Sequence, residues 1–366
     1  MTKTSCADTA GDGTYPAPEL PYLPQRPRSA VPGIGLIGCG GIAPRHLEAC
    51  LAMGYPVAAL CDTVPERAET LRARYFPEAA VYSDHRRLLH DDRVEVVDAA
   101  IHPAERASVI EDALCAGRHV LSQKPFVTDL DRGMQLIELA DQQGLKLAVN
   151  QNARWAPHFS YMRQAVARGL TGAVESVRMS LHWDHNWTAA TPFNTMRDLA
   201  LFDFGIHWFD LVQGFMGGER AGRVYAAVRR APGQEAAPPL LAHAVMEYPA
   251  AQASLVMNGA TRHGVESRTV VVGDRGTIIS GGPDLNRQEV TLHTDAGTAT
   301  PLLSGEWFTN GFQGTISELL CAVEENKRHY NSALENLESL ALCFAAVASS
   351  LDGEPKKPWS VRRLPG

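Results

Sequence analysis

The sequence predicts a doubly wound α/β domain with a parallel sheet, followed by an α+β domain with a large, mostly antiparallel open sheet. A chain of 366 residues is longer than one hydrophobic core usually serves. Strands and helices alternate in its first half, whereas strands follow one another with few helices between them in much of the second half. We therefore expect an N-terminal arm over residues 1–30, one domain over 31–152 and a second domain over 153–366.

Short apolar strands alternate with helical segments between residues 33 and 150. The strands are expected at GIGLIGCG, PVAALCD, Val94–Ile101, His119–Ser122 and Leu145–Asn150. The helices are expected at APRHLEACLAM, VPERAETLRARYF, Arg106–Ala116 and Leu130–Gln143, and Gly54, Gly117 and Gly144 are stop signals. This alternation indicates right-handed βαβ units, whose parallel strands are covered on both faces.

The pattern changes after residue 152. Helices are expected at His158–Arg168, Phe202–Met216, Gly311–Asn326 and Ala333–Ser350. Strands are expected at Val174–Trp183, Arg223–Val228, Ala242–Glu247, Ala253–Met257, Thr269–Val272 and Val290–His293. Residues 273–276 (GDRG) form a hairpin signal, and consecutive strands joined by such turns indicate antiparallel pairing.

Composition narrows the classes of protein. A net charge of -7 argues against nucleic acid as a partner, because phosphate binding needs a basic face. No apolar run reaches the roughly 20 residues of a membrane span, so no membrane partner is expected. The seven cysteines form no CxxC pair and no Cys/His cluster, which is typical of reduced thiols in a cytoplasmic protein. Residues 1–30 carry five prolines, which predicts an extended or disordered arm that is either a free tail or wraps a neighbouring subunit.

The string GLIGCGGIAPRH places Gly38, Gly40 and Ala43 in a GxGxxA pattern between a strand and a helix. Gly38 permits the tight turn, Gly40 lets the backbone approach a pyrophosphate, and Ala43 lets the helix pack near the strand. The N–H groups of the helix N-terminus then face the phosphates. Asp62 ends the second strand, nineteen residues after Ala43, where a carboxylate can accept both ribose hydroxyls. The pattern predicts a Rossmann domain that binds NAD, because Asp62 would repel a 2′-phosphate, and Arg67 leaves NADP as the alternative.

Further motifs make the chain resemble the glucose–fructose oxidoreductase/inositol dehydrogenase family (Gfo/Idh/MocA) over residues 33–350. They are the glycine-rich turn, AGRHVLSQKP at 116–125, Arg154 with Pro157, and DFGIH at 203–207 followed by Asp210. The chain departs from the family pattern at Gln123, where the family usually has Glu, and at Arg106, near the place of a frequent histidine. The resemblance implies an NAD(P)-dependent dehydrogenase or reductase that acts on a CH–OH group of a sugar, cyclitol or related polyol. It also implies a homodimer or homotetramer, paired through the antiparallel sheet.

The residues expected around the dinucleotide lie in the glycine turn, at the ends of the following strands and in the Lys-Pro motif. They are Gly38, Cys39, Gly40, Gly41, Ile42, Asp62, Thr63, Arg67, His102, Pro103, Gln123 and Lys124.

Lys124 and the helix expected from Phe202 supply the candidate catalytic groups. Lys124 follows a buried strand at its carboxyl end, the edge where α/β sheets bind ligands, although a lysine there is more often a solvated charge. In the expected helix, Asp203, His207 and Asp210 are spaced i, i+4, i+7 and share one face. A carboxylate four residues before an imidazole can hold its tautomer and raise its basicity, and the alternative is a helix with a capping aspartate and a surface histidine.

The resemblance implies a role for each group. His207 acts as the general base on a substrate hydroxyl, Lys124 donates to the same oxygen, and Asp203 orients His207. The expected substrate contacts are Arg154, Trp183, Asp203 and His207. The aromatic and polar side chains of residues 181–187 suit a sugar or cyclitol, or else they pack in the core. Gly205 serves helix packing or leaves room for a nicotinamide or substrate.

Two other classes of function remain open. His182, His185, Asp203 and His207 could bind a divalent metal for hydrolysis or isomerisation, which leaves the nucleotide pattern unexplained, so no metal is expected. The chain could also be a non-catalytic dinucleotide sensor or structural protein on the same fold. The presence of Lys124, Asp203 and His207 together, as the family resemblance requires, favours the oxidoreductase.

Overall fold

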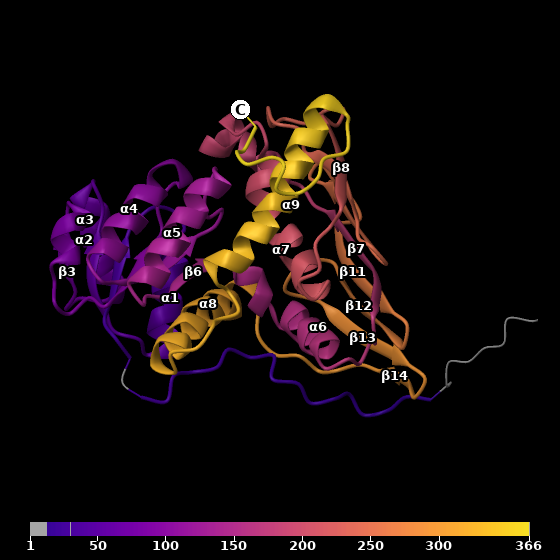
Figure 1. Cartoon of the computed structure of the whole chain (residues 1–366), viewed down its shortest axis with the longest axis horizontal. Helices are drawn as coiled ribbons and strands as arrows, with labels where there is room; N and C mark the ends of the chain where they lie inside the picture. Colours follow the sequence, from indigo (N-terminus) through magenta and orange to yellow (C-terminus); the bar gives the residue numbers. More distant parts are fainter. Residues whose placement is uncertain (1–12, 30, 366) are drawn as a thin grey trace, which may run out of the picture.

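The structure of the protein, a computed structural model, describes residues 13–29 and 31–365 and contains two sheets (Figure 1). The first is a six-stranded parallel sheet in the order β3-β2-β1-β4-β5-β6. Its strands are β1 (Ile34–Ile37), β2 (Val57–Cys61), β3 (Ala80–Tyr82), β4 (Val96–Ala99), β5 (His119–Gln123) and β6 (Leu147–Asn150). The chain winds outward from β1 in both directions, which confirms the doubly wound prediction. The switch point lies between β1 and β4, where such sheets bind ligands.

Five helices from the same half of the chain flank this sheet. They are α1 (Ala43–Met53), α2 (Pro65–Tyr75), α3 (His85–Leu89), α4 (Pro103–Cys115) and α5 (Leu130–Gln142). The sequence did not predict β3 or α3, because a half-buried strand of three residues carries no apolar run. The sequence also predicted the start of α4 at Arg106, three residues after the observed start at Pro103. His102 caps that helix by accepting a hydrogen bond from the backbone N–H of Ala104, and Pro103 occupies its first turn.

The second sheet has eight strands in the order β14-β13-β12-β11-β7-β10-β9-β8. They are β7 (Val174–His182), β8 (Arg223–Arg229), β9 (Leu241–Glu247), β10 (Gln252–Asn258), β11 (Glu266–Gly273), β12 (Gly276–Gly282), β13 (Glu289–Thr294) and β14 (Gly297–Ala299). All neighbours are antiparallel except β7 and β10, so the prediction of a mostly antiparallel sheet is confirmed. The predicted hairpin joins β11 to β12 through the pair Gly273 and Gly276.

Helices cover one face of this sheet, and Figure 1 shows α6 (Pro157–Ala167), α7 (Ile206–Phe215) and α9 (Ala333–Asp352) on that side. Side chains alternate accordingly, as in β9, where Ala242, Ala244 and Met246 are buried and the residues between them are exposed. The expected helix over 202–216 is not continuous. A π-helical turn, η4 (Leu199–Phe204), precedes α7, and Gly205 separates the two.

The last two helices connect the sheets. Ile316, Leu319 and Leu320 of α8 (Trp307–Glu324) pack into the core of the parallel sheet beside α1. α9 packs against α5, α7 and β8. Within the described residues, α9 is the one helix whose length and apolar composition would allow it to cross a membrane, and 67% of its apolar window is buried inside the protein. It is a central helix of the largest core cluster.

The described chain ends run along both domains, since Arg26 contacts α1 and Arg363 pairs with Asp129 beside α5. Thr14 of the arm pairs with Thr298 at the β14 edge, and Lys356 pairs with Val224 at the β8 edge, so both sheet edges are capped. The hydroxyl of Tyr161 in α6 donates to the carbonyl of Pro18 at 2.9 Å. Residues 13–29 are thus extended and contact their own chain. Residues 1–12 and 30 of the predicted arm, with Cys6, lie outside the described residues.

Candidate active site

The glycine-rich turn leads from β1 into α1. Gly38 has φ +95°, and a Cβ on it would lie 2.6 Å from the carbonyl oxygen of Ala100 and from Cγ2 of Ile101. Only glycine fits there. A Cβ on Gly40 or Gly41 would meet no atom within 4 Å. The turn is therefore packed on the sheet side and open at the N-terminus of α1, the geometry that lets a pyrophosphate approach the backbone.

Asp62 lies at the end of β2, facing this turn. Its Oδ2 accepts from the backbone N–H of Cys39 at 2.8 Å, and its Oδ1 accepts from that of Val64 at 2.8 Å. The carboxylate is 9% exposed, and Nη1 of Arg67 lies 4.0 Å from Oδ1. Two backbone donors thus fix the carboxylate, and its remaining lone pairs can accept from ribose hydroxyls.

A cavity of about 480 Å³ lies beside the turn. Six of the residues predicted to contact a dinucleotide line it, namely Gly38, Gly40, Asp62, Thr63, Arg67 and His102. The other six do not. Cys39 contributes its backbone to Asp62, Gly41 and Ile42 immediately precede α1, Pro103 begins α4, and Gln123 and Lys124 lie at the end of β5. The lining also includes Ser83–Arg86, which sequence reasoning missed because these residues follow the unpredicted strand β3.

The side chain of Gln123 contacts both Lys124 and a histidine of α1. Its Oε1 accepts from the backbone N–H of Lys124 at 2.7 Å, and its Nε2 lies 3.5 Å from Nε2 of His46 in α1. Nδ1 of His46 is 2.7 Å from Oδ2 of Asp98 in β4. The side chains of Gln123, His46 and Asp98 are all buried. Gln123 therefore belongs to a buried polar network that includes the helix after the glycine turn.

Lys124 and Asp203 form an ion pair between the two domains. Nζ of Lys124 donates to the backbone carbonyl of Asp203 at 2.9 Å and to its Oδ2 at 3.2 Å. The two side chains are 15% and 11% exposed, so the pair is largely shielded from water. The structure thus brings together two of the three predicted catalytic residues from positions 79 apart in the sequence.

His207 lies in the first turn of α7. Burial and then the positive charge of Lys124 hold the pKa of His207 well below its usual value. Nδ1 is buried and has no hydrogen-bond partner among the described residues. His207 is therefore neutral at neutral pH and can accept a proton.

The expected contact from Asp203 to His207 is wrong. The ammonium of Lys124 takes the carboxylate instead, and the pKa of the imidazole is lowered rather than raised. The regular spacing that predicted the contact is broken by the π-helical turn. Gly205 is required there, because a Cβ would lie 2.4 Å from the carbonyl oxygen of Leu201. Backbone packing, not room for a ligand, therefore explains this glycine.

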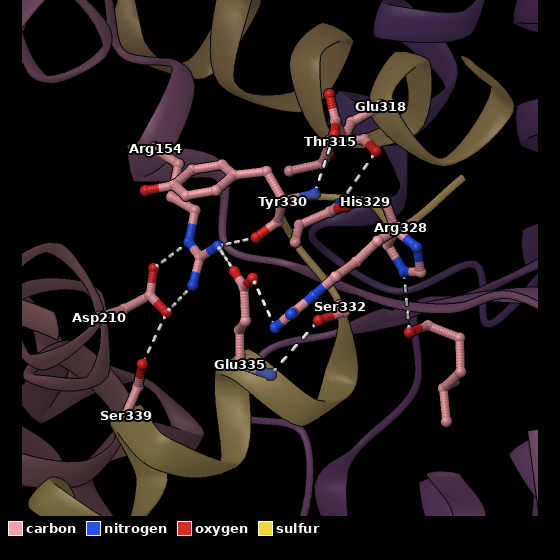
Figure 2. A network of polar contacts seen from close by, with 12 residues as sticks. Arg154, Asp210, Thr315, Glu318, Arg328, His329, Tyr330, Ser332, Glu335 and Ser339 are labelled. Carbon is pink, nitrogen blue, oxygen red and sulfur yellow. Dashed lines mark hydrogen bonds and ion pairs between the residues drawn. The ribbon is translucent and has the colours of Figure 1, made fainter. Parts of the chain in front are cut away.

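Arg154 and Asp210 are buried, and they belong to one polar network with Glu335 (Figure 2). Nε and Nη2 of Arg154 bind the Asp210 carboxylate at 2.6 and 2.7 Å. Nη1 donates to Glu335 at 3.2 Å and to the carbonyl of Tyr330. Arg154 is 2% exposed and every guanidinium nitrogen has a protein acceptor. This geometry does not support Arg154 as a substrate contact, and it also takes Asp210 away from the face that Asp203 and His207 were expected to share with it.

Aromatic rings surround His207. Trp307 of α8 lies 5.6 Å from it and Trp208 6.1 Å, measured between ring centroids. Trp208 lies 5.4 Å from Trp183, which stacks on His185 at 5.4 Å. Sequence reasoning included Trp183 but missed Trp307, which lies a hundred residues away on a helix with no local motif.

The stacked His185 is one of the four residues considered for a metal. No group of three or more His, Cys, Asp or Glu side chains in residues 13–29 and 31–365 is placed to hold a metal ion.

Known proteins match both halves of the chain. Residues 33–151 match the model of an oxidoreductase family with an NAD-binding Rossmann fold, and residues 159–279 match the GFO/IDH/MocA C-terminal domain. D-apiose dehydrogenase of Paraburkholderia graminis is 26% identical over 337 residues, which cover 87% of each chain. Inositol 2-dehydrogenase of Rhizobium meliloti is 25% identical over 332 residues, 86% of this chain and 96% of that protein. The crystal structure of an Agrobacterium radiobacter oxidoreductase in complex with NAD+, L-tartaric acid and magnesium has a TM-score of 0.79 at 21% identity, covering 91% of this chain and 99% of that one.

Proposed function

The chain belongs to the Gfo/Idh/MocA family of NAD-binding oxidoreductases, and on that premise we propose that it moves a hydride between a nicotinamide and a hydroxyl-bearing carbon of a sugar, cyclitol or related polyol. The single observation that carries this proposal is the convergence of Lys124, Asp203 and His207. The ammonium of Lys124 binds the carboxylate of Asp203, and its positive charge helps to lower the pKa of the buried imidazole of His207.

The residues around the glycine turn fit a dinucleotide. The open N-terminus of α1 would take the pyrophosphate, and Asp62 would accept from the ribose hydroxyls. Asp62 favours NAD, since its charge would repel a 2′-phosphate, and NADP remains the alternative because Arg67 is adjacent. Bound there, the nicotinamide would supply the hydride acceptor for oxidation and the donor for reduction.

Side chains of the protein would accept the proton and stabilise the charge on the reacting oxygen. The neutral imidazole of His207 accepts the hydroxyl proton. The ammonium of Lys124 donates a hydrogen bond to the same oxygen and stabilises the negative charge that develops on it. Asp203 fixes the ammonium through its carbonyl and its carboxylate. In reduction the imidazole returns the proton.

A polyol substrate suits the aromatic surroundings of His207. Trp183 presents a half-buried ring that packs on the buried ring of Trp208, and burial of His185 lowers its pKa to about 4, so this imidazole is uncharged at neutral pH. Aromatic rings stack on the apolar face of a sugar ring, while the polar tips of such side chains can bind its hydroxyls.

The test is an absorbance assay for reduced nicotinamide with NAD or NADP and a panel of sugars and cyclitols. We expect turnover with at least one member of the panel, and its loss in Lys124→Met and His207→Gln while dinucleotide binding persists. Binding of the dinucleotide without turnover of any substrate would favour the sensor instead. Wild-type turnover in both variants would remove this assignment of the site.

We also propose a cytoplasmic homo-oligomer. The six described cysteines are all free. The outer face of the eight-stranded sheet carries Tyr225 and Val245, which are 45% and 40% exposed, and both edges of the sheet are capped. A second copy would therefore pair with the face and not with an edge. Sedimentation of Val245→Lys tests this, because a buried lysine at the interface should shift the protein toward the monomer, and an unchanged oligomer would contradict the proposal.

A further inference from the structure

Arg106 is a buried arginine without an ion-pair partner in the described part of the chain. It lies in α4, is 1% exposed, and is one of the largest fully buried side chains among the described residues. Its Nε donates to the carbonyl of Ile101 at 3.1 Å, and Nη2 donates to the same carbonyl. Its Nη1 donates to the carbonyl of Pro125. One planar guanidinium therefore holds two backbone carbonyls.

Those carbonyls belong to the loops on either side of the proposed reaction site. Ile101 follows β4, lines the dinucleotide cavity and contacts the glycine turn at Gly38. Pro125 follows Lys124 directly, at the end of the adjacent strand β5. Arg106 thus links the loop that lines the cavity to the residue that directly follows Lys124.

The charge of Arg106 also acts on the site. Burial lowers the pKa of Arg106 to about 9, and the negative charge of Asp203 opposes this shift. Asp203 is the carboxylate that pairs with Lys124. The carboxylate of Asp203 thus interacts with two positive charges, so the net charge of these three groups is positive.

We propose that Arg106 is a positioning residue that fixes Lys124 and adds a second, buried positive charge that favours the alkoxide-like transition state. This rests on the function proposed above. Neither effect needs contact with substrate, because the guanidinium acts through the Pro125 carbonyl and through its field in a site shielded from water.

The first test compares Arg106→Met and Arg106→Lys with Arg118→Met. Arg118 is a matched control, since it is partly buried, donates to a carbonyl (Leu89, 3.0 Å) and precedes the opposite end of β5. A small misplacement can cost about 100-fold in rate. We expect kcat to fall by roughly that factor in both Arg106 variants, with little change in the Kd of NAD and little effect of Arg118→Met. A kcat within twofold of wild type in Arg106→Met would overturn the proposal and leave the proposed function intact.

Chemical rescue separates charge and positioning from simple filling of space. In Arg106→Ala, added methylguanidinium should restore part of kcat, and added methylurea, which is similar in shape but neutral, should not. Equal rescue by both compounds would show that volume alone matters.

A further measurement does not depend on activity. Amide hydrogen exchange in the peptides that contain Ile101 and Pro125 should accelerate in Arg106→Met and stay unchanged in Arg118→Met. If the wild-type protein turned over no polyol at all, the proposed function would fail while this measurement still tested the link between the two loops. Unchanged exchange at both loops would end that part of the proposal.

Discussion

The side chain of Lys124 donates to the backbone carbonyl of Asp203 at 2.9 Å, while the carboxylate of the same aspartate lies 3.2 Å from the ammonium. Lys124 ends a strand of the parallel sheet, and Asp203 lies in a π-helical turn of the second domain. The pair therefore depends on how the two domains dock, and any change in that docking should alter the position of the ammonium.

The charge of Lys124 should be measurable at His207. Lys124→Met removes one of the two causes that lower the pKa of His207, while burial remains. We expect the pKa of His207 to rise in this variant and to stay below about 6.5. Histidine titration followed by NMR measures it, and an unchanged value would mean that the two side chains are too far apart to share an oxygen.

Asp62 should control the choice of dinucleotide. Asp62→Ser removes a charged acceptor for the ribose hydroxyls, and a hydrogen bond to a charged group is worth about 1.5–3 kcal/mol. We expect NAD to bind at least about 10-fold more weakly and the ratio of kcat/KM for NADP to that for NAD to rise. Titration with both dinucleotides checks this. An unaltered preference would show that Asp62 does not contact the ribose.

The buried ion pair between Arg154 and Asp210 should be essential for stability and not for substrate binding. Asp210 is fully buried, so Arg154→Met leaves an uncompensated charge, which typically costs about 3–5 kcal/mol of unfolding free energy. Arg287→Met, which breaks the exposed pair with Asp284, should cost about 1 kcal/mol or less. Urea unfolding of both variants gives the comparison. Equal losses would contradict the account of Arg154 as a core residue.

Acid should destabilise the protein through buried neutral histidines. Burial lowers the pKa of His158 to about 3, whereas the unfolded chain has an ordinary pKa near 6.5. The unfolded state therefore binds more protons between these values, and stability is lost as pH falls from about 6.5 toward 3. Between pH 7 and pH 5 this one group should remove about 2 kcal/mol. His158→Gln should flatten that dependence in urea unfolding, and substitution of the exposed His263 in a loop, His263→Gln, should not.

The fold could be predicted from local patterns where the core of an element is formed by its sequence neighbours. The alternation around Gly38 and Asp62 predicted the parallel sheet, and the hairpin at Gly273 predicted a pair in the second sheet. By contrast, Ile316 and its neighbours in α8 complete the core of the first domain from the far end of the sequence. Local periodicity does not show which distant helix packs on a sheet. For the same reason the sequence did not predict that Trp307 lies beside His207.

The partners of charged side chains were harder to predict than their positions. Asp203 lies four residues before His207, but a π-helical turn breaks the helical spacing between them and the ammonium of Lys124 binds the carboxylate. Arg154 carries a family motif, yet its contacts with Asp210, Glu335 and the Tyr330 carbonyl take all of its donors into the core. Tertiary packing decides which partner a charge finds, and sequence spacing alone does not.

The most direct test of the central claim is a crystal structure of the protein with reduced nicotinamide dinucleotide and a polyol that it turns over. We predict one substrate oxygen within hydrogen-bond distance of both Nζ of Lys124 and a ring nitrogen of His207, with the carbon that bears this oxygen against C4 of the nicotinamide. A polyol bound with its reacting oxygen on neither side chain, or a nicotinamide far from both, would contradict the account.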